Sequence, residues 1–275
     1  MTDVAQEVLV PDRDDIHARI DTSRPHSARF WNYFVGGKDY YEVDRELGDQ
    51  IKAIFPGLVD VARTSRHFLG RAVRHLAAEQ GVRQFLDIGT GLPTGDNTHE
   101  VAQQVAPDTR IVYVDNDPLV LAHARALLTS TPEGRTAYID ADLYDPGAIL
   151  EAASDTLDLS QPVALMILNT LGHVADYDDA RSLITRLMAG LPSGSYLTIC
   201  DGTATSEGMI AASEAYNKSD AIPYYVRRVD EITGFFDGLD LVDPGIVRVT
   251  DWRPAPDTPK PATPVDAYGG VGRKP

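Results

Sequence analysis

The chain has 275 residues, and its 41 Asp and Glu residues outnumber its 25 Lys and Arg residues, giving a formal net charge of -16 at pH 7. Such a surface repels phosphate backbones and anionic lipids, which argues against nucleic acids and membranes as partners and favours small molecules. Residues 1–7 carry acids where a secretory signal carries basic residues, and the single cysteine excludes an intramolecular disulfide, so we expect a cytoplasmic protein.

The N-terminal third of the chain is predicted to be helical. Residues 1–20 are polar and acidic, and we expect a flexible segment in front of a single domain over residues 21–275. Residues 21–81 are expected to form a helical cap, because apolar side chains within residues 63–80 fall on one helical stripe. Residues 82–275 are expected to form the core. Four arginines of the cap are interpreted as a solvated helix face rather than a basic patch: Arg63, Arg66, Arg71 and Arg74.

An aromatic run, Phe30–Tyr41, is interrupted by the pair Gly36-Gly37. One interpretation is core packing of an N-terminal helix. The other is a lid over a ligand, in which the glycine pair provides the hinge and Tyr33 or Tyr40 covers the ligand.

From residue 84 to about residue 249, predicted strands alternate with predicted helices. This pattern indicates an α/β fold, a doubly wound and mostly parallel sheet of about seven strands with helices on both faces. Pro244-Gly245 predicts the turn of a hairpin between the last two strands, and the proline-rich residues 254–264 are expected to be extended. The strands are predicted over residues 84–87, 110–115, 136–140, 163–169 and 195–201, with a further pair near 239–242 and 246–250.

Acids and glycines stand at the ends of the first predicted strands. Residues 85–91 read as a buried strand that ends in Asp87 and a glycine turn, and Asp115 ends the next strand. Two neighbouring parallel strands of this kind form a nucleoside pocket, where glycines let the backbone approach the ligand and the second carboxylate accepts hydrogen bonds from the ribose. The Asp87 carboxylate favours S-adenosyl-L-methionine, because it lies where the amino group of that ligand would lie.

The predicted cofactor site follows from these strand ends. Asp115 is assigned to the ribose hydroxyls and Asp142 to the adenine amino group, while Asp87, Gly89 and Gly91 line the methionine part. An aromatic face suits the sulfonium cation, which makes Tyr33 the lid candidate. The complete set of predicted cofactor-binding residues is Tyr33, Asp87, Gly89, Thr90, Gly91, Asp115, Asn116, Asp142, Leu143 and Asn169.

Other nucleotides fit the glycine turn less well. A dinucleotide fingerprint needs a third glycine, but Thr94 occupies the matching position and Pro93 precedes it. No glycine-rich loop followed by Lys and Ser or Thr is present, which argues against ATP.

Two polar residues follow the later strands. His173, in the loop after the fourth strand, is the candidate general base, because its pKa lies near neutrality. A structural role for His173, as a helix cap or in packing under the cofactor, is equally open. Asp201, at the end of the fifth strand, is a candidate for binding a substrate amine or hydroxyl. No Cys and His cluster has metal-ligand spacing, so no metal site is expected.

Several motifs together resemble an actinobacterial family of S-adenosylmethionine-dependent methyltransferases long catalogued as a domain of unknown function. The resemblance runs from about Asp21 to the C-terminus, and it implies a class I, Rossmann-like core with an N-terminal helical cap and S-adenosyl-L-methionine as the cofactor. It does not supply a substrate. The matching residues are Ser27-Ala28-Arg29, Tyr33, Gly36-Gly37-Lys38-Asp39, Asp44, Phe85–Thr94, Tyr113–Pro118, Phe235–Leu239, Pro244-Gly245, Trp252-Arg253-Pro254 and Gly270–Lys274.

The sequence therefore predicts methyl transfer from S-adenosyl-L-methionine to a small molecule, of the kind used in secondary metabolism. Two alternatives stay open. One is a protein that binds the cofactor without transferring its methyl group, as a regulator or partner subunit. The other is a cofactor-assisted cyclase on the same scaffold. The acceptor, the atom that is methylated and the oligomeric state are left open.

Overall fold

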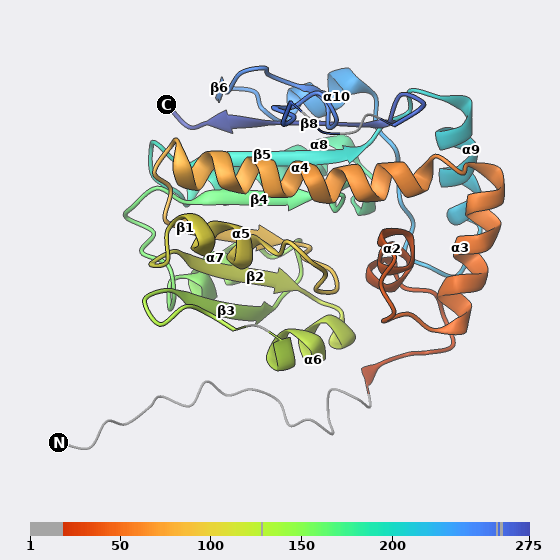
Figure 1. Ribbon diagram of the computed structural model, residues 1–275, viewed down its shortest axis with the longest axis horizontal. Coiled ribbons are helices and arrows are strands. Elements are labelled where there is room, and N and C mark those ends of the chain that lie inside the picture. Colours follow the sequence, from red (N-terminus) through yellow and green to blue (C-terminus); the bar gives the residue numbers. More distant parts are fainter. Residues whose placement is uncertain (1–18, 128, 257, 259–260) are drawn as a thin grey trace.

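The computed structural model describes residues 19–127, 129–256, 258 and 261–275 (Figure 1). Most of the expected flexible segment, residues 1–20, lies outside these described residues. Among the described residues, no helix combines the length and the apolar character that crossing a bilayer requires.

A single mixed sheet forms the centre of the fold. Its strand order is β3-β2-β1-β4-β5-β8-β6, with β7 also paired to β8. The first five strands are parallel, and β8 runs antiparallel to β5, β6 and β7. Because β1 pairs with both β2 and β4, the strand order reverses there, which is where ligands bind in such sheets. The strands are β1 (Gln84–Ile88), β2 (Arg110–Asp115), β3 (Arg135–Asp140), β4 (Ala164–Leu168), β5 (Tyr196–Gly202), β6 (Asp240–Leu241), β7 (Val247–Arg248) and β8 (Ala267–Arg273).

Helices cover both faces of this sheet, and alternate strand residues face the two resulting cores. In β1, Phe85 packs with α4 and α5, whereas Leu86 packs on the opposite face with α7 and α8. Figure 1 shows α4 lying along one face of the sheet. The predicted doubly wound α/β fold is thereby confirmed. The helices are α2 (Ser27–Val35), α3 (Glu42–Ile54), α4 (Leu58–Ala78), α5 (Thr98–Val105), α6 (Pro118–Leu127), α7 (Pro146–Ala153), α8 (Tyr177–Ala189), α9 (Glu207–Tyr216) and α10 (Val229–Gly234), with a 3-10 turn, η1 (Leu171–His173).

The end of the chain differs from the prediction. The expected hairpin is wrong, because β6 and β7 each pair with β8 rather than with one another. Strand β8 was not predicted, since three of its seven residues are glycines, which are depleted in strands, and only Tyr268 and Val271 are typical of them. Glycine is required there because the neighbours are close: a Cβ on Gly270 would lie 2.8 Å from the carbonyl oxygen of Gly245.

The N-terminal helices α2 and α3 cap the carboxyl end of the sheet, beside α9 (Figure 1). A buried ion pair fixes this cap. Arg29 Nε lies 3.0 Å from the carboxylate of Asp44, which is 0% exposed. The same carboxylate accepts hydrogen bonds from the backbone N–H groups of His26 and Tyr41, both at 2.9 Å. Asp44 therefore joins the start of α2 to the start of α3.

Candidate active site

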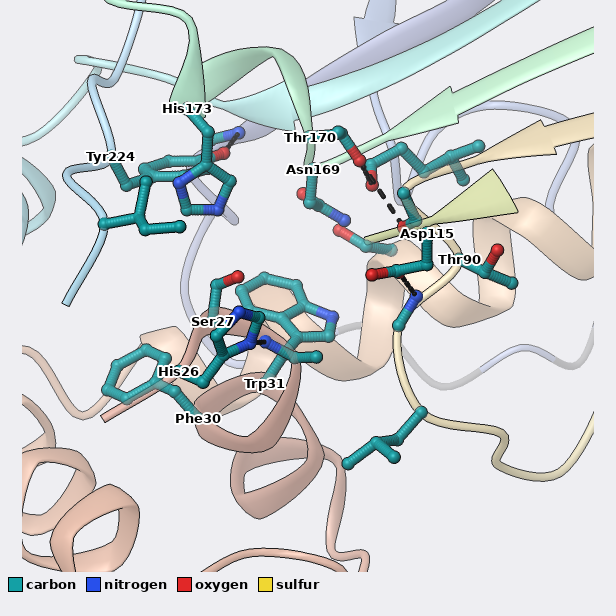
Figure 2. A pocket seen from close by; sticks show the side chains of 18 of the residues that line it. His26, Ser27, Phe30, Trp31, Thr90, Asp115, Asn169, Thr170, His173 and Tyr224 are labelled. Carbon is teal, nitrogen blue, oxygen red and sulfur yellow. Dashed lines mark hydrogen bonds between the residues drawn. The ribbon is translucent and has the colours of Figure 1, made fainter. Parts of the chain in front are cut away.

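A cavity of about 280 Å³ lies between the carboxyl ends of the parallel strands and the helical cap. Figure 2 shows side chains entering it from the strand ends on one side and from α2 on the other. Most of the predicted site residues line it, namely Asp87, Gly89, Thr90, Gly91, Asp115, Asn116, Asp142, Leu143, Asn169 and His173.

Asp115 organises the glycine turn. One carboxylate oxygen accepts a hydrogen bond from the Gly91 backbone N–H at 2.8 Å, and the other accepts one from the Asp117 N–H at 3.0 Å. Burial raises the pKa of Asp115, and these two donors oppose the shift. Gly91 has a φ of 66°, and a Cβ there would meet nothing within 4 Å. The turn therefore presents bare backbone to the cavity.

Asp87 lies deeper, at the end of β1. It is 4% exposed, and one carboxylate oxygen accepts a hydrogen bond from the Thr98 hydroxyl at 2.6 Å. Burial raises its pKa to about 6, while Thr98 and the positive charge of Arg66 pull it down. The carboxylate is therefore a buried anion without a full complement of donors, which suits it to a cationic ligand group.

Arg66 and Ser65 of α4 also line the cavity, and neither is among the predicted site residues. The Arg66 Nε atom and the Ser65 hydroxyl are both buried and have no hydrogen-bond partner among the residues that the structure describes. The solvated-face interpretation is wrong for Arg66 and also for Arg71, whose Nε donates to the Trp252 carbonyl at 2.8 Å. A signal existed in the sequence, because Ser65 and Arg66 interrupt the apolar stripe between Ala62 and Leu69.

The end of β4 meets the glycine turn at close range. A Cβ on Gly89, whose φ is 70°, would collide with the side chain of Thr170. Asn169 adopts a φ of 55°, and within the described part of the chain its Oδ1 atom is buried without a partner. The Oδ1 acceptor of this strained residue therefore lies at the carboxyl ends of β1 and β4, where the strand order reverses.

The edge of the cavity next to β3 is polar and open. Asn116 and Asp142 are exposed, and the Asn116 amide lies 3.4 Å from the Asp142 carboxylate. Asp142 also accepts a hydrogen bond from the Tyr144 N–H at 2.9 Å, which orders this loop. Leu143 is half-buried and adds an apolar side chain to this edge of the cavity.

The loop after β4 places His173 against the far part of the cavity (Figure 2). Its Nδ1 atom lies 2.9 Å from the carbonyl oxygen of Pro223, so Nδ1 carries the proton and Nε2 is the acceptor nitrogen of the ring. Burial lowers the pKa of His173, which keeps the ring neutral near pH 7.

Asp201 has a different place from the one predicted. It is 2% exposed and does not line the cavity. Its carboxylate accepts hydrogen bonds from the Tyr224 hydroxyl and, at 3.1 Å, from the Gly172 N–H. Burial raises its pKa to about 6. Asp201 therefore orders the loop that carries His173 and does not contact the cavity contents itself.

Tyr33 is the other correction, since it is not among the cavity-lining residues. Its hydroxyl donates to Asp49 on α3, and its ring packs edge-on against Tyr40 at 5.2 Å. Each helical residue advances by about 100°, so Tyr33 lies on the opposite side of α2 from Trp31. Trp31 lines the cavity instead, together with His26 and Ser27 (Figure 2).

The lining residues fit the groups of S-adenosylmethionine. An adenosine finds a bare glycine turn, the Asp115 carboxylate and the apolar side chain of Leu143. An amino acid group finds the Asp87 anion for its ammonium and the unpartnered Arg66 Nε for its carboxylate. These donors and acceptors are complementary in charge to a zwitterionic ligand.

Comparisons with known proteins agree with this fit. The chain is similar to the crystal structure of a DUF574 family protein from Streptomyces avermitilis, at 49% identity over 94% of this chain and 100% of that chain, with a TM-score of 0.90. It is also similar to a protein from Thermobifida fusca, provisionally described as a methyltransferase, at 39% identity over 92% of this chain and 96% of that one, with a TM-score of 0.85.

A more distant match extends the likeness in fold. Magnesium protoporphyrin IX methyltransferase from Synechocystis, solved with S-adenosylhomocysteine, is 13% identical over 90% of this chain and 93% of that chain, with a TM-score of 0.53. A curated relative, the carboxy-S-adenosyl-L-methionine synthase of Trichlorobacter lovleyi, is 25% identical over 169 residues, or 60% of this chain. The match spans 64% of that relative, less than two thirds of its length.

The decisive comparison is with a family model. The model described as S-adenosyl methyltransferase matches residues 13–275, nearly the whole chain. The resemblance predicted from the sequence motifs is thereby confirmed, and so are the cofactor and the kind of enzyme it implied. The chain belongs to the S-adenosyl methyltransferase family.

Proposed function

We propose that this enzyme transfers the methyl group of S-adenosylmethionine to a small molecule held between the sheet and the helical cap. The observation that carries the proposal is the extent of the cavity. It continues beyond the strand ends into a second half lined by apolar residues of the cap, of α9 and of the loop after α9, such as Phe30, Met209 and Ile222. A cofactor fills the strand-end half, which leaves this second half for an acceptor.

The cofactor is held by residues of opposite charge. Asp115 accepts hydrogen bonds from the ribose hydroxyls and Asp142 accepts one from the adenine amino group. Asp87 pairs with the ammonium, and Arg66 binds the carboxylate. Because the adenosine and the amino acid group bind to different residues, the ligand can lie in one direction only. Its sulfur then faces the loop after β4 and the acceptor half.

The cofactor supplies an electrophilic methyl group on a positively charged sulfur. The protein contributes alignment and the exclusion of water. Holding an acceptor in line with such a methyl group accounts for on the order of 7–11 kcal/mol of the barrier in favourable cases. The ring of Trp31 and the apolar side chains of α2 keep the acceptor half dry, which strengthens every electrostatic contact inside it.

Two measurements test the proposal. Calorimetric titration should show binding of S-adenosylmethionine and S-adenosylhomocysteine but not of NAD. Incubation with S-adenosylmethionine and a panel of small-molecule acceptors should then release S-adenosylhomocysteine and a methylated product. Binding of NAD with no response to S-adenosylmethionine would overturn the proposal. Binding of S-adenosylmethionine without product for any acceptor would favour a regulatory subunit, and conversion of a substrate with the cofactor unchanged would favour a cyclase.

A further inference from the structure

His26 is the first residue of the cap to enter the cavity. It precedes α2, and its backbone N–H donates to the buried Asp44 carboxylate at 2.9 Å. Asp44 is held in turn by Arg29. The position of the His26 backbone is therefore fixed by a buried ion pair, although the imidazole itself is half-buried and lines the cavity.

The imidazole of His26 is paired with a carboxylate from the core. Its Nδ1 atom lies 2.8 Å from Oδ2 of Asp117, which is 3% exposed. Two lone pairs at that distance would repel, so Nδ1 carries a proton and Nε2 is left as an acceptor. The Ala28 N–H, at 3.4 Å from Nδ1, is a far weaker contact. Burial works against the charged form of Asp117, but His26, the Leu119 N–H and the charge of Arg29 together outweigh it and lower the pKa of Asp117.

His173 lies across the cavity from His26 (Figure 2). Both rings are fixed through Nδ1, His26 by Asp117 and His173 by the Pro223 carbonyl. The two rings differ in the group beside Nδ1 that would stabilise a positive charge once Nε2 has accepted a proton. An imidazolium at His26 is stabilised by a buried carboxylate, whereas one at His173 meets only a neutral carbonyl and a buried environment that lowers its pKa. Of the two rings, His26 is the one with a carboxylate beside its Nδ1 atom.

The side chains that line the acceptor half of the cavity indicate which kind of acceptor it binds. Four aromatic side chains contribute to it, and among the described lining residues Arg66 is the only Lys or Arg. Because Arg66 lies beside Asp87 in the cofactor half, nothing cationic is left to bind an anionic acceptor. The half suits a neutral aromatic ring that carries a proton-bearing nucleophile. The aromatic residues are Phe30, Trp31, Tyr216 and Tyr224.

We propose that His26, oriented by Asp117, is the general base for O-methylation of a phenolic acceptor, and that His173 positions the hydroxyl. This inference rests on the proposed function. The phenol O–H bond breaks and its proton passes to Nε2 of His26. The oxygen electron pair forms the new bond to the methyl carbon, while the electrons of the breaking carbon–sulfur bond return to sulfur. The products are an aryl methyl ether, S-adenosylhomocysteine and an imidazolium, which then releases its proton to water.

The test uses 4-nitrophenol, whose phenolate absorbs visible light, so that proton loss is seen without turnover. The intact enzyme saturated with S-adenosylhomocysteine is titrated with the probe over a range of pH. Bound probe should ionise at a lower pH than free probe, because the protonated His26 that results stabilises the phenolate. An imidazolium at hydrogen-bond distance corresponds to a shift of about 1–3 pKa units. The charged or titratable groups facing His26 are Asp115 at the end of β2, Asp117 after β2, Arg29 on α2, Asp44 on α3 and His173 on η1.

Two variants and a matched control decide the outcome. His26→Asn removes the imidazole and places a residue favoured at helix N-caps before α2, and Asp117→Asn keeps an acceptor for the Leu119 N–H at 2.8 Å. In both variants, the pKa of bound 4-nitrophenol should rise by about one unit or more relative to the wild type, while S-adenosylhomocysteine binds normally. The control is His123→Gln, because His123 also lies beside a carboxylate, 3.9 Å from Asp39, but does not line the cavity. This variant should leave the pKa of the bound probe unchanged.

Three results would overturn the inference. An unchanged shift in both His26→Asn and Asp117→Asn would show that this pair is not the base. Loss of the shift in His173→Asn alone would transfer the role to His173. Failure of the enzyme to bind 4-nitrophenol and 2-naphthol, while it still binds S-adenosylhomocysteine, would reject a phenolic acceptor. Failure to bind S-adenosylhomocysteine would instead reject the proposed function, so the two are distinguishable.

Discussion

The Asp115 carboxylate at the end of β2 accepts a hydrogen bond of 2.8 Å from the backbone N–H of Gly91, in the turn after β1. This contact joins the two strand ends that form the cofactor half of the cavity. Each carboxylate oxygen keeps a lone pair beyond the one used by the backbone. The side chain thus positions the glycine turn and still has acceptors for a diol.

Replacing Asp115 with Ala should weaken binding of S-adenosylhomocysteine by about 1.5–3 kcal/mol, the contribution of hydrogen bonds to a charged group. This corresponds to a loss of roughly tenfold or more, measured by calorimetry. The matched control is Asp140→Ala. Asp140 also ends a strand, but it is exposed, pairs with Arg19 at 3.0 Å and does not line the cavity. Equal affinities for the two variants would remove Asp115 from the ligand site.

Arg66→Gln should weaken binding of the amino acid end of the cofactor without affecting its adenosine end. We expect roughly tenfold weaker binding of S-adenosylhomocysteine, because a charge-assisted contact to its carboxylate is lost. Binding of 5′-methylthioadenosine, which lacks the amino acid group, should be unchanged. Arg63→Gln, an exposed arginine on the same helix, is the control. If both ligands lose affinity equally, Arg66 acts on the fold of the site and does not bind the carboxylate.

Asp87 should make stability depend on pH. Its pKa is about 6 in the folded protein against 3.8 for an ordinary aspartate, so the folded state holds the proton more tightly. The free energy of unfolding therefore falls as the pH rises from 3.8 to about 6 and is constant above that range, as far as this group is concerned. Two pKa units correspond to about 3 kcal/mol.

The measurement is thermal unfolding of Asp87→Asn. The variant should be more stable than the wild type at pH 8, where Asp87 is a buried anion, and similar to it at pH 4. It should also lose affinity for S-adenosylhomocysteine, because the ammonium loses its counter-charge. A stability difference that is the same at both pH values would contradict the raised pKa.

Substitution with alanine should mainly lower stability at Gly89 and mainly lower cofactor affinity at Gly91. Both have positive φ, which costs about 1–2 kcal/mol for a residue with a Cβ. Gly89→Ala adds a collision with Thr170 and should unfold at clearly lower temperature. Gly91→Ala meets no protein atom within 4 Å, so its Cβ enters the cavity and should mainly reduce cofactor affinity. Equal losses of stability would show that Thr170 moves aside at little cost.

The segment from about His26 to Asp44 is predicted to close over the cofactor. Lys38, next to the glycine pair, is exposed, so trypsin cleavage after it reports on opening. Saturating S-adenosylhomocysteine should slow this cleavage in the wild type. Asp115→Ala, tested at a ligand concentration that it does not bind, should show no protection. Equal cleavage rates in the wild type with and without ligand would mean that the segment is ordinary packing.

The parallel part of the sheet was predictable because both of its faces are buried. Strands such as Arg110–Asp115 are then continuous apolar runs, and the acid that follows each run stands at the ligand-binding edge. Strand β8 could not be found in this way. Its glycines are selected by the close approach of Gly245 and of β5, a tertiary relationship that no local pattern contains.

The same reason explains which site residues were found. Asp87 and Asp115 are marked by their position at strand ends, which is a local property. His26 and Arg66 belong to the site only because the cap folds back onto the sheet. Tyr33 was selected for its chemistry, but the helical rotation of α2 turns it toward Asp49.

The buried ion pair of Arg29 and Asp44 has an evolutionary consequence. It fixes the path of the cap backbone from inside the cap, without using the side chains that face the cavity. Substitutions at Phe30 or Trp31 can then alter the shape of the acceptor half while the strand ends, and with them cofactor geometry, stay the same. Duplicated genes on this scaffold can diverge in what they methylate through a few positions of one short helix.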